Sequence, residues 1–391
     1  MTKRVAIVGI GQTPHKSRMP EYSAGEMINL AVRAALEDAQ ISRKDVDQVL
    51  LSNMEHFEGN YFVEGMFSDY VGSYLKPGLK VQVMGTTGAS MVSAAWYFVA
   101  SGLFDTVLTV AYQKQHEGHS GAVLQSAAEP AYDRIMTGHA AMYVQASLSQ
   151  HYMNETGCRP EHAAMVRVKA SDNGRRNPFA HLKLNLTVED VTNSRVLVWP
   201  LRYLDICPTS AGACALVLAS EERARKITDK PVWIKDHVAV HQESFTLSVM
   251  HYYPDPFPRE TTREVASKKI CARNGITNLA REIDVFEIYE PSTYGELQYM
   301  EDLGICGRGE AWKLVERGAT TLEGEVPVNP SGGVLSTNAI GDCAMMRVAE
   351  AALQVRGDAG EHQVTRRVNT ALAHGFGGRG YTTLHLLSKT P

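Results

Sequence analysis

A short apolar strand, a helix and a second strand follow one another at the start of the chain, and this order restricts the fold more than any other feature. Val5–Val8 is a branched apolar run that leads into a Gly-x-Gly turn, apolar residues recur at helical spacing over 27–36, and the next apolar run covers 46–51. A second unit follows, with the segment 80–83 and the strand-like run 106–110 around a helix of small residues at 89–100. This order predicts a parallel sheet with helices on its faces.

The second half of the chain repeats the first. Residues 281–288 resemble residues 43–51, and the helix that ends at Gly357 resembles the one that ends at Gly102. Together these similarities predict a duplicated α/β lobe. The polar segment 220–230 is the expected boundary. The predicted parts are an N-terminal lobe at 1–225, with a long loop insertion at about 113–200, and a C-terminal lobe at 231–391.

The composition excludes several classes of protein. The 391 residues are 44% hydrophobic and 21% charged, with a net charge of -4, and no segment interleaves basic residues with aromatics, so nucleic acid is not an expected partner. A run of about 18 apolar residues is missing, and the N-terminal run is too short for a signal peptide, so no membrane span is expected. The six cysteines occur singly without a CxxC pair, which predicts a reduced, cytoplasmic setting and no metal in this chain.

Three segments carry a resemblance to a known family. They are Asn329–Ser336, with its paired glycines, Pro200–Ala213 and Asn177–Ala180. In these segments the chain resembles the thiolase superfamily, specifically the sterol-carrier-protein thiolase-like and lipid-transfer-like branch, and the resemblance extends over essentially the whole chain. It implies a thiolase fold, in which two duplicated βαβ lobes form five layers in the order α-β-α-β-α. It also implies that coenzyme A thioesters are the substrates and that coenzyme A itself takes part.

The chain departs from the thiolase pattern at the catalytic positions. Gly85 stands where the family has its nucleophilic cysteine, at the start of a helix that would lower the pKa of a thiol. Tyr289 occupies the place of a catalytic histidine, Asn338 is the nearest equivalent of the Gly-His-Pro loop, and His374 replaces the acid-base cysteine near the C-terminus. Since glycine has no side chain, acyl-cysteine chemistry at position 85 is not expected.

Each candidate residue has a structural interpretation beside the functional one. His374 is the expected base because imidazole titrates near neutral pH, although it could only bond to the glycine loop. Tyr289 could stabilise an oxyanion or fill the core, Asn338 could be an amide donor or a turn residue, and Cys343 could reach the pocket or only pack. Glu290 is added as a titratable neighbour of Tyr289. The residues expected to contact coenzyme A or the substrate are Gly85, Ser331, Gly332, Gly333 and Gly377.

Two reactions need no cysteine nucleophile, and both stay open. In a retro-Claisen thiolysis, free coenzyme A attacks a 3-ketoacyl-coenzyme A; benzoylsuccinyl-coenzyme A, which would yield benzoyl- and succinyl-coenzyme A in aromatic degradation, is one substrate that the resemblance implies. In a retro-aldol cleavage of a 3-hydroxyacyl-coenzyme A, as in steroid side-chain aldolases of the same branch, a second tyrosine acts where this chain has Asn338-Ala339. A third hypothesis is a non-catalytic acyl-binding scaffold.

The resemblance also implies partners. Its relatives work with a small subunit that carries a zinc finger and an OB-like fold, so a similar partner and a heterotetramer are expected here. A homodimer through the sheet edge of the first lobe is expected as well, because a strand at the edge of a sheet offers unpaired backbone groups to a second copy.

Overall fold

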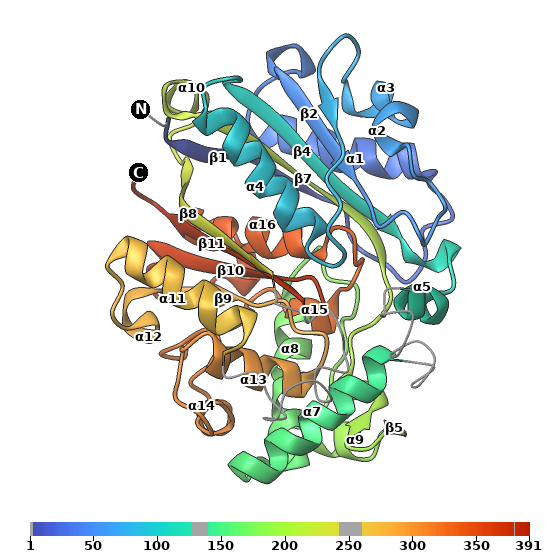
Figure 1. Ribbon diagram of the computed structural model, residues 1–391, viewed down its shortest axis with the longest axis vertical. Helices are drawn as coiled ribbons and strands as arrows, with labels where there is room; N and C mark the ends of the chain where they lie inside the picture. The colour runs from blue at the N-terminus through green and yellow to red at the C-terminus, as the bar shows by residue number, and fades with distance from the viewer. Residues whose placement is uncertain (1–2, 127–139, 242–259, 379) are drawn as a thin grey trace.

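The computed structural model describes residues 3–126, 140–241, 260–378 and 380–391. Within these residues, one sheet of nine strands has the order β3-β2-β4-β7-β1-β8-β11-β10-β9 (Figure 1). The strands of the first half are β1 Val5–Gln12, β2 Gln48–Ser52, β3 Gly78–Leu79, β4 Thr106–Lys114 and β7 Ala211–Ser220. Those of the second half are β8 Val232–His241, β9 Val285–Glu287, β10 Thr370–Phe376 and β11 Tyr381–Ser388.

The strand pairing repeats between the two halves. In the first half, β1 pairs antiparallel with β7, β7 antiparallel with β4, and β4 parallel with β2. In the second half, β8 pairs antiparallel with β11, β11 antiparallel with β10, and β10 parallel with β9. The halves meet where Ala6 and Ile7 of β1 pair with Trp233 and Val232 of β8. The predicted duplication is confirmed, while the division of the chain at 225 and 231 stays a prediction.

The expectation of a parallel sheet is wrong, because the sheet is mixed. β1, β2 and β4 run in the same direction, as the strand–helix–strand order predicts, but β7 returns antiparallel between β4 and β1. Strand β7 follows the long insertion in the chain, so the local order of strands and helices could not indicate its antiparallel direction. The segment 80–83 is also not a strand, since the edge strand β3 ends at Leu79.

Five layers follow from where the helices pack. Helices α4 (Thr87–Ala100) and α16 (Cys343–Arg356) lie between the two halves of the sheet and share one core with strands of both. Helix α1 (Ala24–Asp38) covers the outer face of the first half, and α11 (Thr262–Asn274) and α13 (Thr293–Asp302) cover the outer face of the second (Figure 1).

Local signals explain the matching outer helices. Ser23 caps α1 in a capping box with Glu26, and Thr261 caps α11 in the same way with Glu264. In such a box each side chain satisfies a backbone N–H that the first turn leaves free. The two helices that cover equivalent strands therefore begin with the same signal, which is further evidence of duplication.

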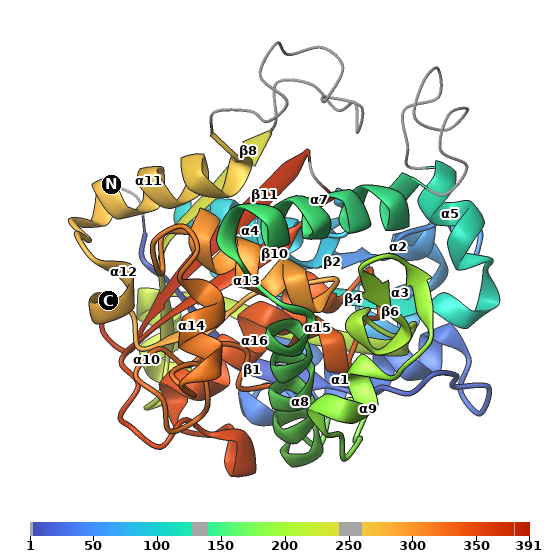
Figure 2. The same cartoon turned by 90° about the horizontal axis from the view of Figure 1, so that it is seen from below.

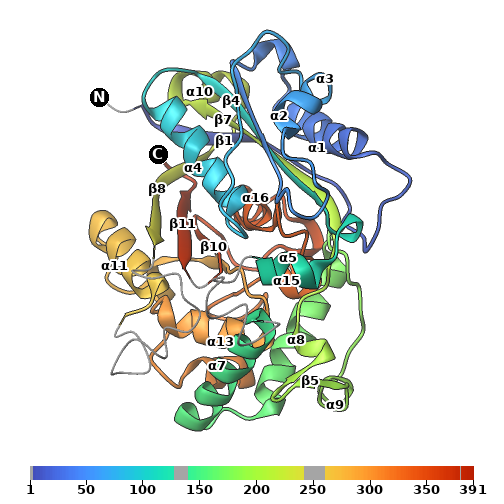
Figure 3. The same cartoon turned by 45° about the vertical axis from the view of Figure 1, so that its right-hand side comes forward.

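The insertion folds into helices beside the second half. Figures 2 and 3 show α7 and α8 next to α13 and α15, and α8 contacts both of the latter. No helix of the described residues is long and apolar enough to cross a membrane. The helices of the insertion are α5 Ser120–Ser126, α7 Ala140–Thr156, α8 Pro160–Arg176 and α9 Val188–Thr192, followed by the hairpin β5 Val196–Val198 and β6 Leu201–Arg202. The remaining helices are α2 Val63–Met66, α3 Ser68–Val71, α10 Glu221–Ile227, α12 Leu279–Glu282, α14 Ala311–Glu316 and α15 Gly333–Ser336.

The contact between the central helices generates a stability prediction. A β-carbon at Gly88 would lie 2.6 Å from the backbone nitrogen of Met345, so α4 and α16 can approach this closely only at a glycine. We expect Gly88→Ala to lower the free energy of unfolding by about 2–4 kcal/mol, because backbone must move to accept the methyl group. Gly78→Ala is the control, since its β-carbon would meet nothing nearer than 3.9 Å. Urea denaturation of both variants is the measurement, and equal losses would contradict the packing described.

Candidate active site

Tyr289 lies where the chain leaves the second half of the sheet. Strand β9 ends at Glu287, and Ser292 caps α13 by accepting a hydrogen bond from the Gly295 N–H, so the residues between form a short, fixed connection. The Tyr289 side chain is 3% exposed. Its hydroxyl donates to Asn338 Oδ1 at 3.3 Å, and burial raises its pKa well above the ordinary value. The phenol is therefore protonated at neutral pH.

Asn338 is held by the segment that precedes β7. Its backbone N–H donates to Ser210 Oγ at 3.0 Å, and the Ser210 N–H donates to its carbonyl oxygen at 2.9 Å. Its Nδ2 donates to Cys207 Sγ at 3.2 Å. The His181 N–H, in turn, donates to Thr337 Oγ1 at 2.9 Å. The regions of the three segments singled out in the sequence therefore meet around Asn338.

Gly85 faces this pair from the turn that precedes α4. A β-carbon at Gly85 would lie 3.6 Å from the Tyr289 hydroxyl and only 2.4 Å from the carbonyl oxygen of Phe376. The backbone at the end of β10 thus occupies the space that a larger residue at position 85 would need. Helix α4 begins two residues later, and its N-terminal N–H groups give this corner a positive potential. The structure brings Gly85, Tyr289 and Asn338 together.

Cys343 joins the same group but is not activated. Its thiol lies 3.3 Å from the Thr337 carbonyl oxygen and 3.5 Å from Asn338 Oδ1, and it is fully buried. Burial raises the pKa of the Cys343 thiol well above its ordinary value, with the carboxylate of Asp342 as a second cause. A thiol in these surroundings stays protonated, so its geometry suits packing better than nucleophilic attack.

His374 lies on the other face of β10. A β-carbon at Gly375 would touch the β-carbon of Ala89 in α4, and neighbouring residues in a strand alternate faces. The His374 ring therefore packs edge-on against Tyr299, and its Nδ1 accepts the Tyr289 N–H at 3.3 Å. Burial, with the Arg263 charge as a second cause, holds the pKa of His374 well below 6.5. The structure connects His374 to the backbone of Tyr289 and not to its hydroxyl.

Glu290 turns away from the Tyr289 hydroxyl. Its Oε1 accepts the Leu335 N–H at 3.1 Å, and its Oε2 has no partner among the described residues. Burial, with the nearby Glu296 as a second cause, raises the pKa of Glu290 to about 8. Glu290 is thus mostly a neutral acid at pH 7 that supports the turn of α15.

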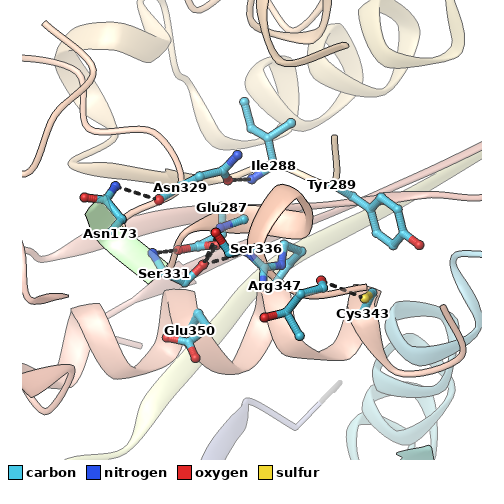
Figure 4. Close-up of polar contacts among 12 residues, drawn as sticks. Asn173, Glu287, Ile288, Tyr289, Asn329, Ser331, Ser336, Cys343, Arg347 and Glu350 are labelled. Carbon is cyan, nitrogen blue, oxygen red and sulfur yellow. Dashed lines mark hydrogen bonds and ion pairs between the residues drawn. The ribbon is translucent and has the colours of Figure 1, made fainter. Parts of the chain in front are cut away.

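A buried ion pair holds the loop at the start of Asn329–Ser336, which leads into α15, against the sheet and α16 (Figure 4). Arg347 of α16 forms an ion pair with Glu287 of β9, and both also bind Ser331 through its hydroxyl. Asn329 fixes the loop to β9, since its Oδ1 accepts the Ile288 N–H at 2.7 Å. Ser331, Gly332 and Gly333 are buried in these contacts, so their expected contact with coenzyme A stays a prediction.

Three further residues complete the surroundings of Tyr289 and were not chosen from the sequence. Cys207 binds Asn338, Phe376 packs against Tyr289, and Met84 precedes Gly85; all three are partly exposed and lie at the rim of the site. Cys207 lies in the segment Pro200–Ala213 that carries the family resemblance, directly after Asp205-Ile206. The sequence could therefore have indicated it as a site residue. Burial raises the pKa of its thiol to about 12, so the thiol is protonated at neutral pH. Gly377 lies beside them, packed against Thr86.

The candidate site contains several hydrogen-bond donors and few side chains that could act as a general base. The site contains the protonated Tyr289 phenol, the Asn338 carboxamide, the uncharged Cys343 thiol and the positive end of α4. The phenol O–H, the Asn338 Nδ2–H and the helix N–H groups are donors, which can stabilise negative charge on a bound oxygen. Among the described residues, no group of three or more His, Cys, Asp or Glu side chains could hold a metal ion. The site therefore suits a reaction in which an oxyanion develops next to a bound thioester.

Comparisons with known proteins agree along the length of the chain. A family model described as thiolase C-terminal domain-like matches residues 244–389. An acetyl-CoA acetyltransferase of Methanothermobacter thermautotrophicus is 30% identical over 98% of this chain and 99% of its own. The benzoylsuccinyl-CoA thiolase subunit BbsB of Thauera aromatica is 28% identical over 98% of both chains.

A solved structure shows the same fold. The Ltp2-ChsH2(DUF35) aldolase superposes with a TM-score of 0.84 and 25% identity, over 100% of this chain and 99% of that one. The fold class predicted from the resemblance is thereby confirmed. Because the similarity to the Methanothermobacter acetyltransferase covers 98% of this chain and does not stop at the C-terminal domain, the chain belongs to the thiolase family.

Proposed function

We propose that the protein cleaves a 3-ketoacyl-coenzyme A by direct attack of free coenzyme A, without an acyl-enzyme intermediate. The observation that carries the proposal is the contact of Tyr289 with Asn338 beside a glycine whose β-carbon position is closed by the Phe376 carbonyl. Family membership supports acyl transfer between coenzyme A thioesters. The missing thiol at position 85 requires that the incoming coenzyme A attack the ketone itself.

The groups present can complete such a reaction. Coenzyme A carries an alkyl thiol, a small fraction of which is thiolate at neutral pH. Its sulfur bonds to C3 of the substrate, and the Asn338 amide and the start of α4 stabilise the resulting oxyanion. The C2–C3 bond then breaks, C3 becomes the new thioester, and Tyr289 donates its proton to C2. The proton lost by the thiol returns to Tyr289 through solvent, so the enzyme is restored.

His374 receives a different role from the one predicted. Since its Nδ1 accepts the Tyr289 N–H, the proton of the neutral ring belongs on Nε2, which is then a donor and not a base. Its pKa, far below 6.5, keeps it in this state at neutral pH. We propose that His374 positions Tyr289 by holding its backbone.

The similarity to BbsB supports benzoylsuccinyl-coenzyme A as one candidate substrate and aromatic degradation as one setting. Thiolysis would yield benzoyl- and succinyl-coenzyme A. Other 3-ketoacyl thioesters, as in β-oxidation, fit the same chemistry.

The retro-aldolase is the second candidate, favoured by the structural similarity to the Ltp2-ChsH2(DUF35) aldolase. This reaction must first remove a proton from the 3-hydroxyl group. The raised pKa of Tyr289 makes its phenolate a costly base, and the second tyrosine of the aldolases is replaced by Asn338-Ala339. The present geometry therefore supports thiolysis better. Cleavage of 3-hydroxyacyl thioesters without added coenzyme A would reverse this preference.

Steady-state kinetics of thiolysis test the site. Tyr289→Phe and Asn338→Ala should each lower kcat by about 10²–10⁴-fold with little change in coenzyme A affinity, because both act on the transition state. The double variant should lose less than the product of the two effects. Tyr294→Phe is the matched control, since it removes the hydroxyl of another buried tyrosine and should change kcat less than about 3-fold.

The assay uses a panel of 3-ketoacyl thioesters that includes benzoylsuccinyl-coenzyme A, with thermal melting of each variant to exclude misfolding. Near wild-type turnover in both single variants would show that the site is assigned wrongly. Absence of turnover in the wild-type protein, with and without a partner, would favour the scaffold.

We also propose the assemblies that the resemblance implied. The name of the aldolase neighbour includes a DUF35 partner, and BbsB is named as a subunit, which supports a small zinc-finger and OB-like partner here. For the homodimer, the support is an apolar surface around the edge strand β3. Its members are Tyr61, Phe62, Met66, Tyr74, Leu75 and Leu79, which are 40% to 88% exposed.

Light scattering tests the homodimer. The purified chain at micromolar concentration should have the mass of two chains, and Leu75→Asp with Leu79→Asp should reduce it to one, because charges at the edge oppose burial. Leu103→Asp is the control, as Leu103 is 64% exposed in the turn after α4. A wild-type mass of one chain would refute the proposal.

A further inference from the structure

Among the residues that the structure describes, Arg167 is a buried cation without a carboxylate partner. It lies on α8 and is 1% exposed, and no described carboxylate approaches within the 4.0 Å of an ion pair. The buried Arg347 differs, since it pairs with Glu287, and the partly exposed Arg263 pairs with Asp302. A buried guanidinium without a counter-ion is strongly unfavourable, so its presence calls for an explanation.

The carboxyl groups around Arg167 are engaged elsewhere. Asp205 accepts hydrogen bonds from the Arg202 N–H and the Thr293 hydroxyl, both at 2.9 Å. Glu290 accepts the Leu335 N–H and is mostly protonated at neutral pH. Arg167 itself donates through Nη1 to the Leu335 carbonyl oxygen, and its Nε has no partner among the described residues. The guanidinium therefore keeps donor capacity, at its Nε, that the described residues do not use.

Arg167 lies next to the proposed site. Leu335 connects Arg167 with the site. Arg167 binds the Leu335 carbonyl oxygen, and Leu335 lies three residues before Asn338 in the chain. Burial lowers the pKa of Arg167, and Cys207 is the first neighbour that opposes this shift, so the two side chains lie close together. Cys207 also contacts the Asn338 side chain. Arg167 thus lies on the Cys207 side of Tyr289 and Asn338, and Cys207 itself is only partly buried.

We propose that Arg167 binds a carboxylate carried by the acyl chain of the substrate, so that the enzyme acts on acidic 3-ketoacyl thioesters. A guanidinium and a carboxylate form two parallel, charge-assisted hydrogen bonds, which suits a donor with a free Nε. The phosphates of coenzyme A fit less well, because the pantetheine arm separates them from the thioester by many bonds. This proposal rests on the proposed function, since it assigns the substrate class of the same site.

Two substrates that differ mainly in the distal carboxylate test it by thiolysis. The wild-type protein, with its partner where one is required, should cleave 3-oxoadipyl-coenzyme A with a kcat/KM at least 30-fold above that of 3-oxohexanoyl-coenzyme A. Arg167→Met should abolish this preference by lowering only the value for the acid, and Arg167→Lys should keep part of it. Arg175→Met, which removes an exposed arginine of the same helix, should change neither value.

Binding measurements separate this proposal from the proposed function. By calorimetry, the wild-type protein should bind succinyl-coenzyme A at least 10-fold more tightly than butyryl-coenzyme A, whether or not it turns over any substrate. Equal affinities in the wild-type protein would overturn the proposal without the need for any variant. If Arg167→Lys weakened the binding of both ligands and of free coenzyme A equally, at an unchanged melting temperature, the proposal would also be overturned. Arg167 would then be assigned to binding a phosphate of coenzyme A.

Discussion

The buried ion pair of Glu287 and Arg347 holds the elements of the candidate site in one place. Glu287 ends β9, two residues before Tyr289, and Arg347 lies in the first turns of α16, four residues after Cys343. Both bind Ser331 of the loop that leads to Asn338. Removal of one partner of such a pair typically costs about 3–5 kcal/mol, because a buried charge is left alone. The pair therefore fixes strand, loop and helix relative to one another.

This rigid support explains how the site differs from that of a cysteine-dependent thiolase. The backbone of Phe376 fills the space beside Gly85, and the Tyr289 hydroxyl points to the same corner. A cysteine could not be restored at position 85 without movement of β10. The surrounding thiols, Cys207 and Cys343, have raised pKa values through burial. What remains is a set of hydrogen-bond donors, which can stabilise charge on a substrate but would not themselves take up an acyl group.

The sequence predicted the fold well because local patterns and duplication reinforce each other. The runs at 5–8, 46–51 and 106–110 are strands, and the small-residue helix at 89–100 is the central helix α4. The candidate site residues Gly85, Tyr289 and Asn338 came from the resemblance, and the structure brings them together. Their roles stay predictions. The orientation of His374 could not be predicted, because the face to which a strand residue points depends on the register of the whole sheet. The burial of Arg167 could have been predicted, because Arg167 falls on the same helical face as Ala163 and Ala170.

The central claim, cleavage without an acyl-enzyme, is tested most directly by intact-mass spectrometry of protein quenched with acid during turnover of a 3-ketoacyl-coenzyme A. The account predicts that the protein keeps its unmodified mass at every time point, including times when product is forming at the steady-state rate. A transient mass increase equal to the acyl group, located on Cys207 or Cys343, would contradict the account and identify a nucleophile.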